Sequence, residues 1–492
     1  MELTSPADLF GREREWASLA RWIADPTPGL QVALVYGRRR QGKSFLLRRL
    51  ARASGGFYHQ AIQHEPAQAL AELGEDLGAH LGVGRLALAS WSEALTLLAG
   101  LGDRARAKPA RGPAVVVLDE FPYLYTSSRE LPSVIQRAVD RSLDEASAPV
   151  RLILCGSALS VMSELVGASA PLHGRIHAQV VLSPFDYRGA RDFWGVDDPA
   201  LALALYAVVG GTPGYRDLAR GRPASLADFD EWVVERVLDP TSALFREDEV
   251  LLAETPDLVN RALYLSILSA VADGNVTQSA IAAAVGRGTS SIQHALESLE
   301  RTGFVDKDDD VVRQRRPYYA IAEPLVRFHQ AIRHRDAARF EDGDGRAAWR
   351  DARARFSSGI LGPTWEGVVR EYVRRFAPEG LVGDVARVGR THVANPDARA
   401  DQEVDVVVVG RGSGPAGGRV RALGEATMRE MAPRDLVRLE DMRARLARRA
   451  PRAALARLIL ASATGHERSL VAAAAARDDV ALLGLADLYG ER

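Results

Sequence analysis

Residues 31–50, QVALVYGRRRQGKSFLLRRL, decide the fold of the amino-terminal part of this chain. The stretch starts with an apolar run at 32–36, passes through a glycine loop and ends in a helical pattern that opens at Ser44. The loop, 37–44, matches the pattern G-x-x-x-x-G-K-[ST] in the strand-to-helix setting that the pattern requires. A simple glycine turn before a helix is the alternative, but strand, loop and helix all agree with the motif.

This loop has the chemistry of a polyphosphate cradle. Gly37 and Gly42 let backbone N–H groups curl around phosphates without a Cβ in the way, and the helix N-terminus adds a positive dipole end. Lys43 is expected to reach the β- and γ-phosphates, and Ser44 to hold Mg²⁺ through its hydroxyl. The predicted nucleotide contacts of the loop are Gly37, Arg38, Arg39, Arg40, Gln41, Gly42, Lys43, Ser44 and Phe45.

The use of lysine supports this interpretation. Of the 63 lysine and arginine residues only three are lysines, namely Lys43, Lys108 and Lys307. Where a plain positive charge suffices, this chain uses arginine. A lysine in the loop therefore indicates a site where a compact ammonium is needed and a planar guanidinium would not fit.

Bulk composition limits the class of protein. With 492 residues the chain is too long for one core, and about three domains are expected. A net charge of -1 confines any nucleic-acid surface to a local patch. Cys155 is the one cysteine, which excludes internal disulfides, and no zinc-ligand spacing occurs. The first residues lack a signal-peptide core, and no run approaches the roughly 20 apolar residues of a membrane span, so a cytoplasmic protein is predicted.

Two carboxylates end the run AVVVLDE, 114–120, and form a second group of candidate site residues. Such a continuous apolar run is typical of a parallel strand that is covered on both faces. A Mg²⁺–nucleotide site needs an acid at the end of this strand, which fits Asp119. The next carboxylate, Glu120, is suited to polarise the attacking water. The alternative is a strand that meets solvent at an acidic turn, and the phosphate loop favours the functional interpretation.

Two further residues follow apolar strands or loops. If the strand at 150–156 lies between the other two, Ser157 comes to lie beside the γ-phosphate; otherwise it is a plain turn serine. Arg175 is either an arginine finger or the partner of an acid. The strand–helix alternation predicts a right-handed parallel α/β domain with its ligand at the carboxyl edge of the strands.

The middle of the chain is predicted to be helical. The segment GGTPGY, 210–215, interrupts a helical region that we interpret as a lid on the nucleotide domain. From Arg261, three helices followed by two short strands predict a winged helix-turn-helix. Its third helix carries Glu297 and Glu300, and the basic cluster of the wing is Arg313, Arg315 and Arg316. Direct DNA binding and a packing or protein-contact role therefore both stay open.

The predicted fold class is α/β: a P-loop NTPase parallel sheet with a helical lid, a winged helix-turn-helix and a carboxy-terminal α/β domain. The charged, turn-prone segment 336–355 is predicted to be a linker. An amphipathic helix at 364–373 and strands at 403–409, 421–427, 455–462 and 480–483 are expected after it. The expected boundaries are 1–195 for the ATPase core, 196–258 for the lid, 259–335 for the winged helix, 336–355 for the linker and 356–492 for the last domain.

With these motifs in place, the chain resembles the archaeal-type P-loop ATPase family, which is related to AAA+ proteins and to the signal-transducing ATPases with numerous domains. The motifs that carry the resemblance are FGRE (10–13), GRRRQGKS (37–44), LDEFPYL (118–124), CGSALSVM (155–162), PLHGR (171–175) and GGTPGY (210–215). The resemblance covers roughly residues 10–330. It implies ATP and Mg²⁺ as ligands, Gly211 and Pro213 as nucleotide contacts near the adenine, and Ser157 as a sensor.

The carboxy-terminal region resembles the restriction-endonuclease-like domain that often follows such ATPases. The pattern of that domain consists of a glutamate on a helix, an aspartate on a strand and then E-x-K. Glu366, Asp405 and Glu425 match its three acidic positions. A metal site formed by Asp405 and Glu425 is expected on this basis. Thr427 stands where the pattern has lysine, so cleavage would need Arg421 or Arg429 as a substitute.

Taken together, these features predict a slow Mg²⁺-dependent ATPase that acts as a nucleotide-driven switch. The predicted catalytic residues are Glu120, Lys43 and Arg175, and the predicted Mg²⁺ ligands are Ser44 and Asp119. The alternative is an ATP-gated effector that binds or cuts DNA, and a third option is a switch that acts on an unknown protein partner. ATP and ADP are the expected ligands, a nucleotide-dependent oligomer is a further expectation, and no membrane association is expected.

Overall fold

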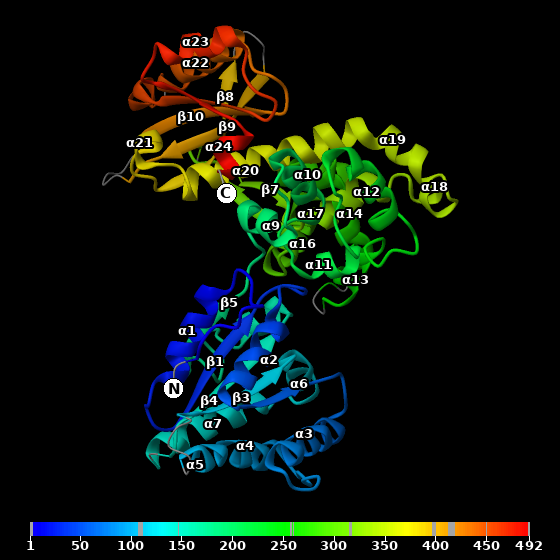
Figure 1. The fold of residues 1–492 in the computed structure, drawn as a ribbon, viewed down its shortest axis with the longest axis vertical. Helices are drawn as coiled ribbons and strands as arrows, with labels where there is room; N and C mark the ends of the chain where they lie inside the picture. Colours follow the sequence, from blue (N-terminus) through cyan, green and yellow to red (C-terminus); the bar gives the residue numbers. More distant parts are fainter. Residues whose placement is uncertain are drawn as a thin grey trace. The chain divides into compact units, whose positions relative to one another are not determined.

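The computed structural model describes residues 3–106, 112–145, 147–255, 258, 260–313, 317–395, 400–411, 419–448 and 450–490. The chain divides into two compact units (Figure 1). The first consists of Met1–Phe185, Thr212–Gly214 and Thr255–Asp257, and the second of Asp186–Gly211, Tyr215–Glu254 and Leu258–Arg492. Each unit is described by itself.

A five-stranded parallel sheet organises the first unit, with the spatial order β2-β3-β4-β1-β5. Its strands are β1 (Leu30–Tyr36), β2 (Phe57–Gln60), β3 (Ala114–Asp119), β4 (Val150–Gly156) and β5 (Ile176–Val181). Because the strands are parallel, their carboxyl ends share one edge, where β1 runs into the phosphate loop. The predicted parallel α/β architecture is confirmed, and β4 does lie between β1 and β3.

Helices cover both faces of this sheet, which explains the continuous apolar runs. In β1, Val32 and Leu34 face a core shared with α3, α4 and α7, whereas Ala33 and Val35 face a core shared with α1 and α2. The helices of the unit are α1 (Glu13–Ala24), α2 (Lys43–Ser54), α3 (Pro66–Leu81), α4 (Trp91–Ala99), α5 (Leu101–Arg106), α6 (Phe121–Ser127), α7 (Leu131–Asp144) and α8 (Leu159–Glu164).

The second unit begins with α9 (Tyr187–Trp194), which lies inside the range predicted for the ATPase core. The helices in the range predicted for the lid are α10 (Pro199–Val209), α11 (Gly214–Ala219), α12 (Phe229–Arg236) and α13 (Glu247–Ala253). The glycine segment at 210–213 separates α10 from α11, as expected. Among all the residues that the structure describes, no helix has the length and apolar character needed to cross a bilayer.

Three helices and a two-stranded antiparallel sheet follow, in the order predicted for a winged helix-turn-helix. They are α14 (Arg261–Ala272), α15 (Gln278–Val285), α16 (Thr289–Arg301), β6 (Val305–Asp309) and β7 (Pro317–Ile321). These elements share a core that includes Ile267, Leu296 and Tyr319, and α13 also contributes to it. Arg315 and Arg316, which were part of the predicted basic cluster, lie outside the described residues.

The segment that was predicted to be a linker is helical. It forms α18 (Ala337–Glu341) and α19 (Gly345–Phe356), which follow α17 (Pro324–Phe328) and the π-helix η3 (His329–Arg333). Phe340, Trp349 and Phe356 are buried in the core of the second unit. The structure differs from the prediction because these few apolar residues lie on one side of helices whose remaining positions are charged.

The carboxy-terminal region contains a five-stranded mixed sheet with the order β12-β11-β10-β9-β8. Its strands are β8 (Arg387–Asn395), β9 (Ala400–Val409), β10 (Val420–Thr427), β11 (Arg457–Ser462) and β12 (Val480–Leu483). The sheet is covered by α20 (Gly362–Arg375) on one face and α22 (Pro433–Ala447) on the other. The strand β8 was not predicted, and most of the predicted glycine loop, 412–418, lies outside the described residues.

The helices α9, α10, α11 and α12 and the carboxy-terminal sheet share one continuous core. The hydroxyl of Tyr187 in α9 donates to the carbonyl oxygen of Leu488, 2.7 Å away, in α24 (Leu485–Tyr489). The rings of Tyr187 and Tyr489 meet edge to face at 5.1 Å. Most of the predicted lid, the predicted winged helix and the last domain therefore belong to one compact unit, and the first division of the chain falls after Phe185.

Candidate nucleotide site at the carboxyl edge of the first sheet

The loop between β1 and α2 has two positions that only glycine occupies without strain. Gly37 has φ 156°, and a Cβ there would lie 2.2 Å from the carbonyl oxygen of Leu182. Gly42 has φ 84°, in the left-handed region that disfavours other residues. Both glycines of the motif are thus required by the backbone path of the loop.

Lys43 is buried at the start of α2, with 6% of its surface exposed. Its Nζ donates to the carbonyl oxygen of Arg38 at 2.9 Å, so the ammonium lies within the curl of the loop. Burial lowers the pKa of Lys43, and the negative charges of Glu120 and Asp119 act in the opposite direction. The loop therefore holds its cation in place, close to the two carboxylates at the end of β3.

Asp119 and Glu120 end β3 in a constrained geometry. Asp119 is fully buried, and its Oδ1 accepts from the backbone N–H of Glu120 at 3.0 Å. Glu120 has φ 54°, an unfavourable conformation for a residue with a side chain and one that clusters at functional sites. Burial raises the pKa of Glu120, and the charge of Asp119 adds to the effect. A carboxylate with a raised pKa is a stronger proton acceptor.

Ser157 directly follows β4, and its hydroxyl donates to Glu120 Oε2 at 3.3 Å. Because β4 separates β1 from β3, Ser157 lies at the same sheet edge as the loop and the acids. The structure thus brings together four of the predicted site residues: Lys43, Asp119, Glu120 and Ser157.

Arg12 also belongs to this edge, although no role was predicted for it. One guanidinium nitrogen, Nη2, donates to the carbonyl oxygens of Gln41 at 3.2 Å and Ser183 at 2.8 Å. Its guanidinium lies 4.6 Å from the centroid of the Phe185 ring. Arg12 therefore connects the FGRE motif to the phosphate loop. The motif at residues 10–13 marked this segment in the sequence, but it did not indicate which residue the arginine contacts.

The glycine segment after α10 contacts the loop as well. The side chain of Gln41 donates from Nε2 to Thr212 Oγ1 at 3.1 Å, and the backbone N–H of Gly214 donates to the carbonyl oxygen of Arg40 at 3.0 Å. A Cβ on Gly214 would lie 2.7 Å from the Cβ of Arg40. These contacts engage Thr212 and Gly214, and the predicted nucleotide contacts of Gly211 and Pro213 stay a prediction.

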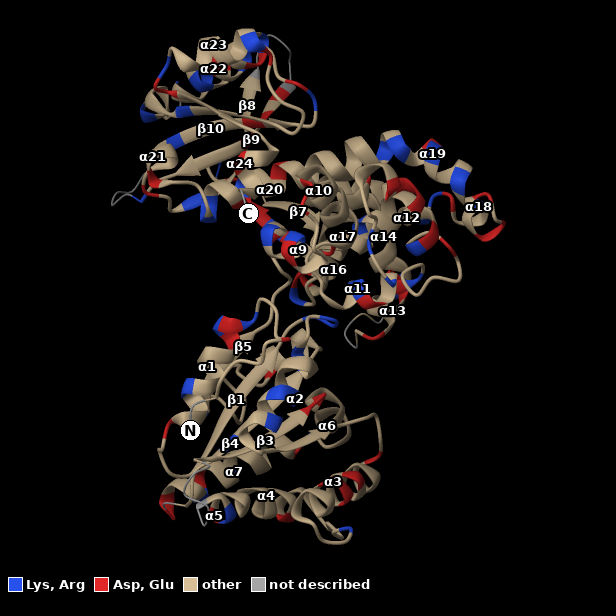
Figure 2. Ribbon diagram, in the orientation of Figure 1, with Lys and Arg blue, Asp and Glu red and all other residues tan. Residues whose placement is uncertain are grey.

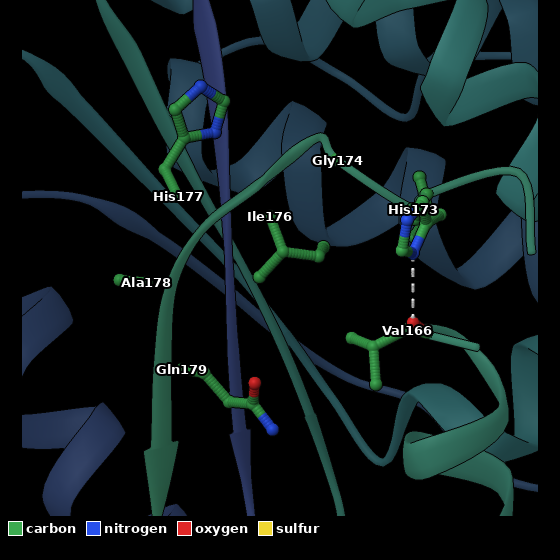
Figure 3. A pocket seen from close by; sticks show the side chains of 8 residues that line it. Val166, His173, Gly174, Ile176, His177, Ala178 and Gln179 are labelled. Carbon is green, nitrogen blue, oxygen red and sulfur yellow. Dashed lines mark hydrogen bonds between the residues drawn. The ribbon is translucent and has the colours of Figure 1, made fainter. Parts of the chain in front are cut away.

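Arg175 lies elsewhere. It directly precedes β5, and its guanidinium donates to both carboxylate oxygens of Asp140, at 2.8 and 3.0 Å. Ile176 pairs with Val32 near the start of β1, which places Arg175 roughly 17 Å along the strand from the edge that carries the loop. Figure 3 shows the ≈ 310 Å³ pocket beside this end of β5. Of the two predicted roles, the structure shows pairing with an acid.

The residues at the carboxyl edge fit a magnesium–nucleotide complex. The glycine positions leave the loop free of a Cβ, the Lys43 ammonium lies inside it, and Asp119 supplies the carboxylate oxygens that Mg²⁺ prefers. Ser44, the other predicted Mg²⁺ ligand, is the second residue of α2. When bound, the ion would neutralise charge on the β- and γ-phosphates.

The acids of the carboxy-terminal domain have different partners. Asp405 lies close to Glu366 of α20, and its Oδ2 accepts from the backbone N–H of Ala426 at 2.9 Å. Glu425 instead pairs with Arg438 of α22, which packs on the opposite face of the sheet. The structure thus groups Asp405 with Glu366 and not with Glu425. Side-chain alternation along β10 explains this, because Ala426 faces α20 and its neighbour faces α22.

Of the two arginines proposed to replace the missing nuclease lysine, Arg429 is already engaged. Its guanidinium donates to both carboxylate oxygens of Asp435, at 2.9 and 2.6 Å. The other, Arg421, has a buried Nε for which the structure shows no hydrogen-bond partner. Thr427, at the lysine position, accepts from the backbone N–H of Arg429 at 3.4 Å.

Asp405 should make stability depend on pH. Burial and the charge of Glu366 raise the pKa of Asp405 to about 7, well above that of an exposed aspartate. The folded state therefore binds the proton more tightly, so stability falls as pH rises from about 4 to about 7. Between about pH 5 and pH 8 the wild type should lose about 3 kcal/mol of unfolding free energy through this group, at about 1.4 kcal/mol per pKa unit. We expect Asp405→Asn to abolish this loss.

Urea unfolding at the two pH values, followed by tryptophan fluorescence, measures this difference. Asp478→Asn is the matched control, because Asp478 is an exposed acid of the same domain. Parallel pH dependences for the wild type and Asp405→Asn would contradict the assignment.

A buried ion-pair network joins α13 to η3. Asp248 is fully buried, and its two carboxylate oxygens lie 2.8 Å from His329 Nδ1 and 2.7 Å from His334 Nε2. Among the described residues, Asp248, Glu249 and His334 form the one group close enough to hold a metal ion. Arg333 Nη2 lies 3.2 Å from Asp248 and 2.7 Å from Glu249, so a guanidinium already supplies the positive charge there.

Comparison with known proteins defines the class. Residues 9–213 match a family described as an ATPase domain predominantly from Archaea. The amino-terminal part of the chain is therefore a P-loop ATPase domain of the archaeal type, which confirms the expectation from the motifs.

Individual relatives are distant. The chain is 24% identical over 219 residues to the uncharacterised protein MJECL04 of Methanocaldococcus jannaschii. This alignment covers 44% of this chain and 48% of that protein. The alignment thus spans about half the length of this curated relative. Among solved structures, the Walker-type ATPase PABY2304 of Pyrococcus abyssi has a TM-score of 0.51 at 21% identity, over 67% of this chain and 98% of that chain.

A weaker structural similarity is to the ORC2 protein of Aeropyrum pernix in its ADPNP–ADP complexes, with a TM-score of 0.44 at 16% identity, over 72% of this chain and 98% of that chain. The similarity to the Pyrococcus protein supports the fold, whereas the similarity to ORC2 is too weak to carry a conclusion.

Proposed function

We propose that this protein is a nucleotide-driven switch in which ATP and Mg²⁺ bind at the carboxyl edge of the first sheet. The phosphate loop would hold the triphosphate with Lys43, and Ser44 and Asp119 would hold the metal. Glu120 would polarise the attacking water and support slow hydrolysis. The proximity of Lys43, Asp119, Glu120 and Ser157 at one sheet edge supports this assignment.

One observation carries the proposal of a switch: two hydrogen bonds join the phosphate loop to the segment Thr212–Gly214. This segment leads directly into α11 in the sequence. A loop that rearranges around a γ-phosphate would change these two hydrogen bonds. The state of the nucleotide would then be transmitted along the chain into the helices that follow.

Hydrogen exchange with and without nucleotide tests this proposal. With ATP and Mg²⁺ we expect slower exchange at the amides of Thr212 and Gly214 and in α11 than with ADP, because the γ-phosphate orders the loop. The variant Thr212→Val removes the hydroxyl that Gln41 contacts while keeping the shape of the side chain. The variant should still bind ATP, but its hydrogen-exchange rates should no longer differ between the ATP and ADP complexes. Identical exchange with the two nucleotides in the wild type would refute the switch.

An ATP-gated DNA effector has less support. A duplex binder neutralises phosphates with lysine and arginine, but α16 exposes Glu297 and Glu300. The adjoining strand β6 exposes Asp306, Asp308 and Asp309. Arg313, the described member of the predicted basic cluster, pairs with Asp401 at 2.8 Å. Basic and acidic positions are interspersed over both units (Figure 2).

The contacts of the wing favour a packing role for the winged-helix module. Thr391 Oγ1 in β8 donates to Asp310 at 2.7 Å, and the hydroxyl of Tyr318 lies 2.8 Å from His392 Nδ1. The guanidinium of Arg390 lies 4.5 Å from the centroid of the Tyr318 ring. These contacts engage the wing with the carboxy-terminal sheet, so we propose that the module acts within the second unit or on a protein partner.

A further inference from the structure

A chain of hydrogen bonds leads from the outer side of α2 to the acid at the end of β3. The hydroxyl of Tyr58, in β2, lies 2.5 Å from Asp119 Oδ2. Arg48, in α2, donates from Nε to the Tyr58 oxygen at 3.2 Å, and its guanidinium lies 5.4 Å from the centroid of the Tyr58 ring. The same guanidinium also donates to the side chain of Gln60, which anchors it along β2.

The direction of the protons in this chain is determined. An arginine side chain has only donors, so the Tyr58 oxygen must accept from Arg48. The hydroxyl proton of Tyr58 is then free to be donated to Asp119, which has no proton to give as a carboxylate.

Both carboxylate oxygens of Asp119 are thereby held. Oδ2 accepts from Tyr58 and Oδ1 from the backbone N–H of Glu120. Two donors in different directions allow one orientation of the carboxylate plane. The partners behind a metal ligand orient it and tune its affinity, and losing one typically weakens metal binding by about 10- to 100-fold.

We propose that Tyr58, supported by Arg48, is a positioning residue that orients Asp119 for Mg²⁺. The inference rests on the proposed function of the nucleotide site and extends it. Tyr58 would contact neither nucleotide nor metal and would act through Asp119 alone. Its loss should therefore change the response to Mg²⁺ and leave Mg²⁺-free binding of nucleotide intact.

The test uses the full chain and a fluorescent ATP analogue, measured first in EDTA and then over a Mg²⁺ titration. For Tyr58→Phe we expect the half-saturating Mg²⁺ concentration to rise about 10-fold, with the affinity in EDTA changed by less than about twofold. Arg48→Met should shift the Mg²⁺ requirement in the same direction by a smaller factor, and Arg48→Lys should restore part of it.

Tyr125→Phe is the matched control, because the guanidinium of Arg129 lies 4.5 Å from the centroid of its ring in a similar pairing. It should leave both measurements unchanged. An unaltered Mg²⁺ requirement in Tyr58→Phe would overturn the proposal, and so would an equal loss of affinity in EDTA, which would indicate a structural role. If the wild type bound no nucleotide, the proposed function itself would fail, and this outcome is visible before any variant is measured.

Discussion

Replacing Lys43 by alanine is expected to remove effective ATP binding, raising Kd by about 100-fold. The ammonium is buried within the phosphate loop and donates to the carbonyl oxygen of Arg38. In the complex it would exchange this contact for the β- and γ-phosphates, and charge-assisted hydrogen bonds of this kind contribute up to about 3 kcal/mol. Calorimetric titration of the full chain with ATP and Mg²⁺ measures the loss.

The scarcity of lysine provides the controls for this experiment. Lys307→Ala removes an exposed lysine in β6 and should leave ATP binding unchanged. Lys43→Arg keeps the charge but replaces a compact ammonium with a planar guanidinium in a buried position, and we expect it to bind ATP poorly as well. Normal ATP affinity or normal ATPase rates in Lys43→Ala would show that this loop is not the nucleotide site.

The second large effect is expected for Glu120→Gln, which should keep ATP affinity within about threefold and reduce hydrolysis by about 10²- to 10³-fold. Glutamine preserves the size of the side chain and can still accept from Ser157, but it cannot take a proton from water. Because burial raises the pKa of Glu120, the acid limb of the wild-type rate profile should lie at higher pH than an exposed glutamate would give.

Single-turnover hydrolysis with excess enzyme separates this effect from binding. Glu130→Gln, an exposed glutamate before α7, is the matched control and should hydrolyse ATP at the wild-type rate. If Glu120→Gln turned over ATP normally, Glu120 would not be the catalytic base. Loss of ATP affinity in Glu120→Gln would instead indicate that this residue shapes the loop.

The nucleotide site was largely predictable because its residues follow rules that are local in sequence. The glycine loop, the acids after an apolar run and the serine after another such run each occur at the end of a parallel strand. Parallel strands bring those ends to one edge of the sheet, so three distant segments could be placed together. The strand order meets the condition set for Ser157, which lies at the same edge and donates to Glu120, whereas its role beside the γ-phosphate stays a prediction.

Other features were missed for identifiable reasons. The strand β8, RVGRTHVAN, has few apolar residues, so its pattern resembles a polar loop. In α19 most residues are charged, so the segment was interpreted as a linker. The apolar residues Trp349, Ala352 and Phe356 nevertheless have helical spacing, which could have been recognised. The metal pair Asp405–Glu425 was chosen from a motif, but side-chain alternation along β10 turns Glu425 towards Arg438.

The sequence by itself determined the ATPase class, because a phosphate loop needs particular residues at fixed spacing and its backbone conformation is set locally by Gly37 and Gly42. Only the tertiary structure decided which side chains support that site. Tyr58, Arg48 and Arg12 act across hydrogen bonds between elements that are far apart in the chain. Such contacts depend on how strands and helices pack against one another, and no short stretch of sequence encodes that packing.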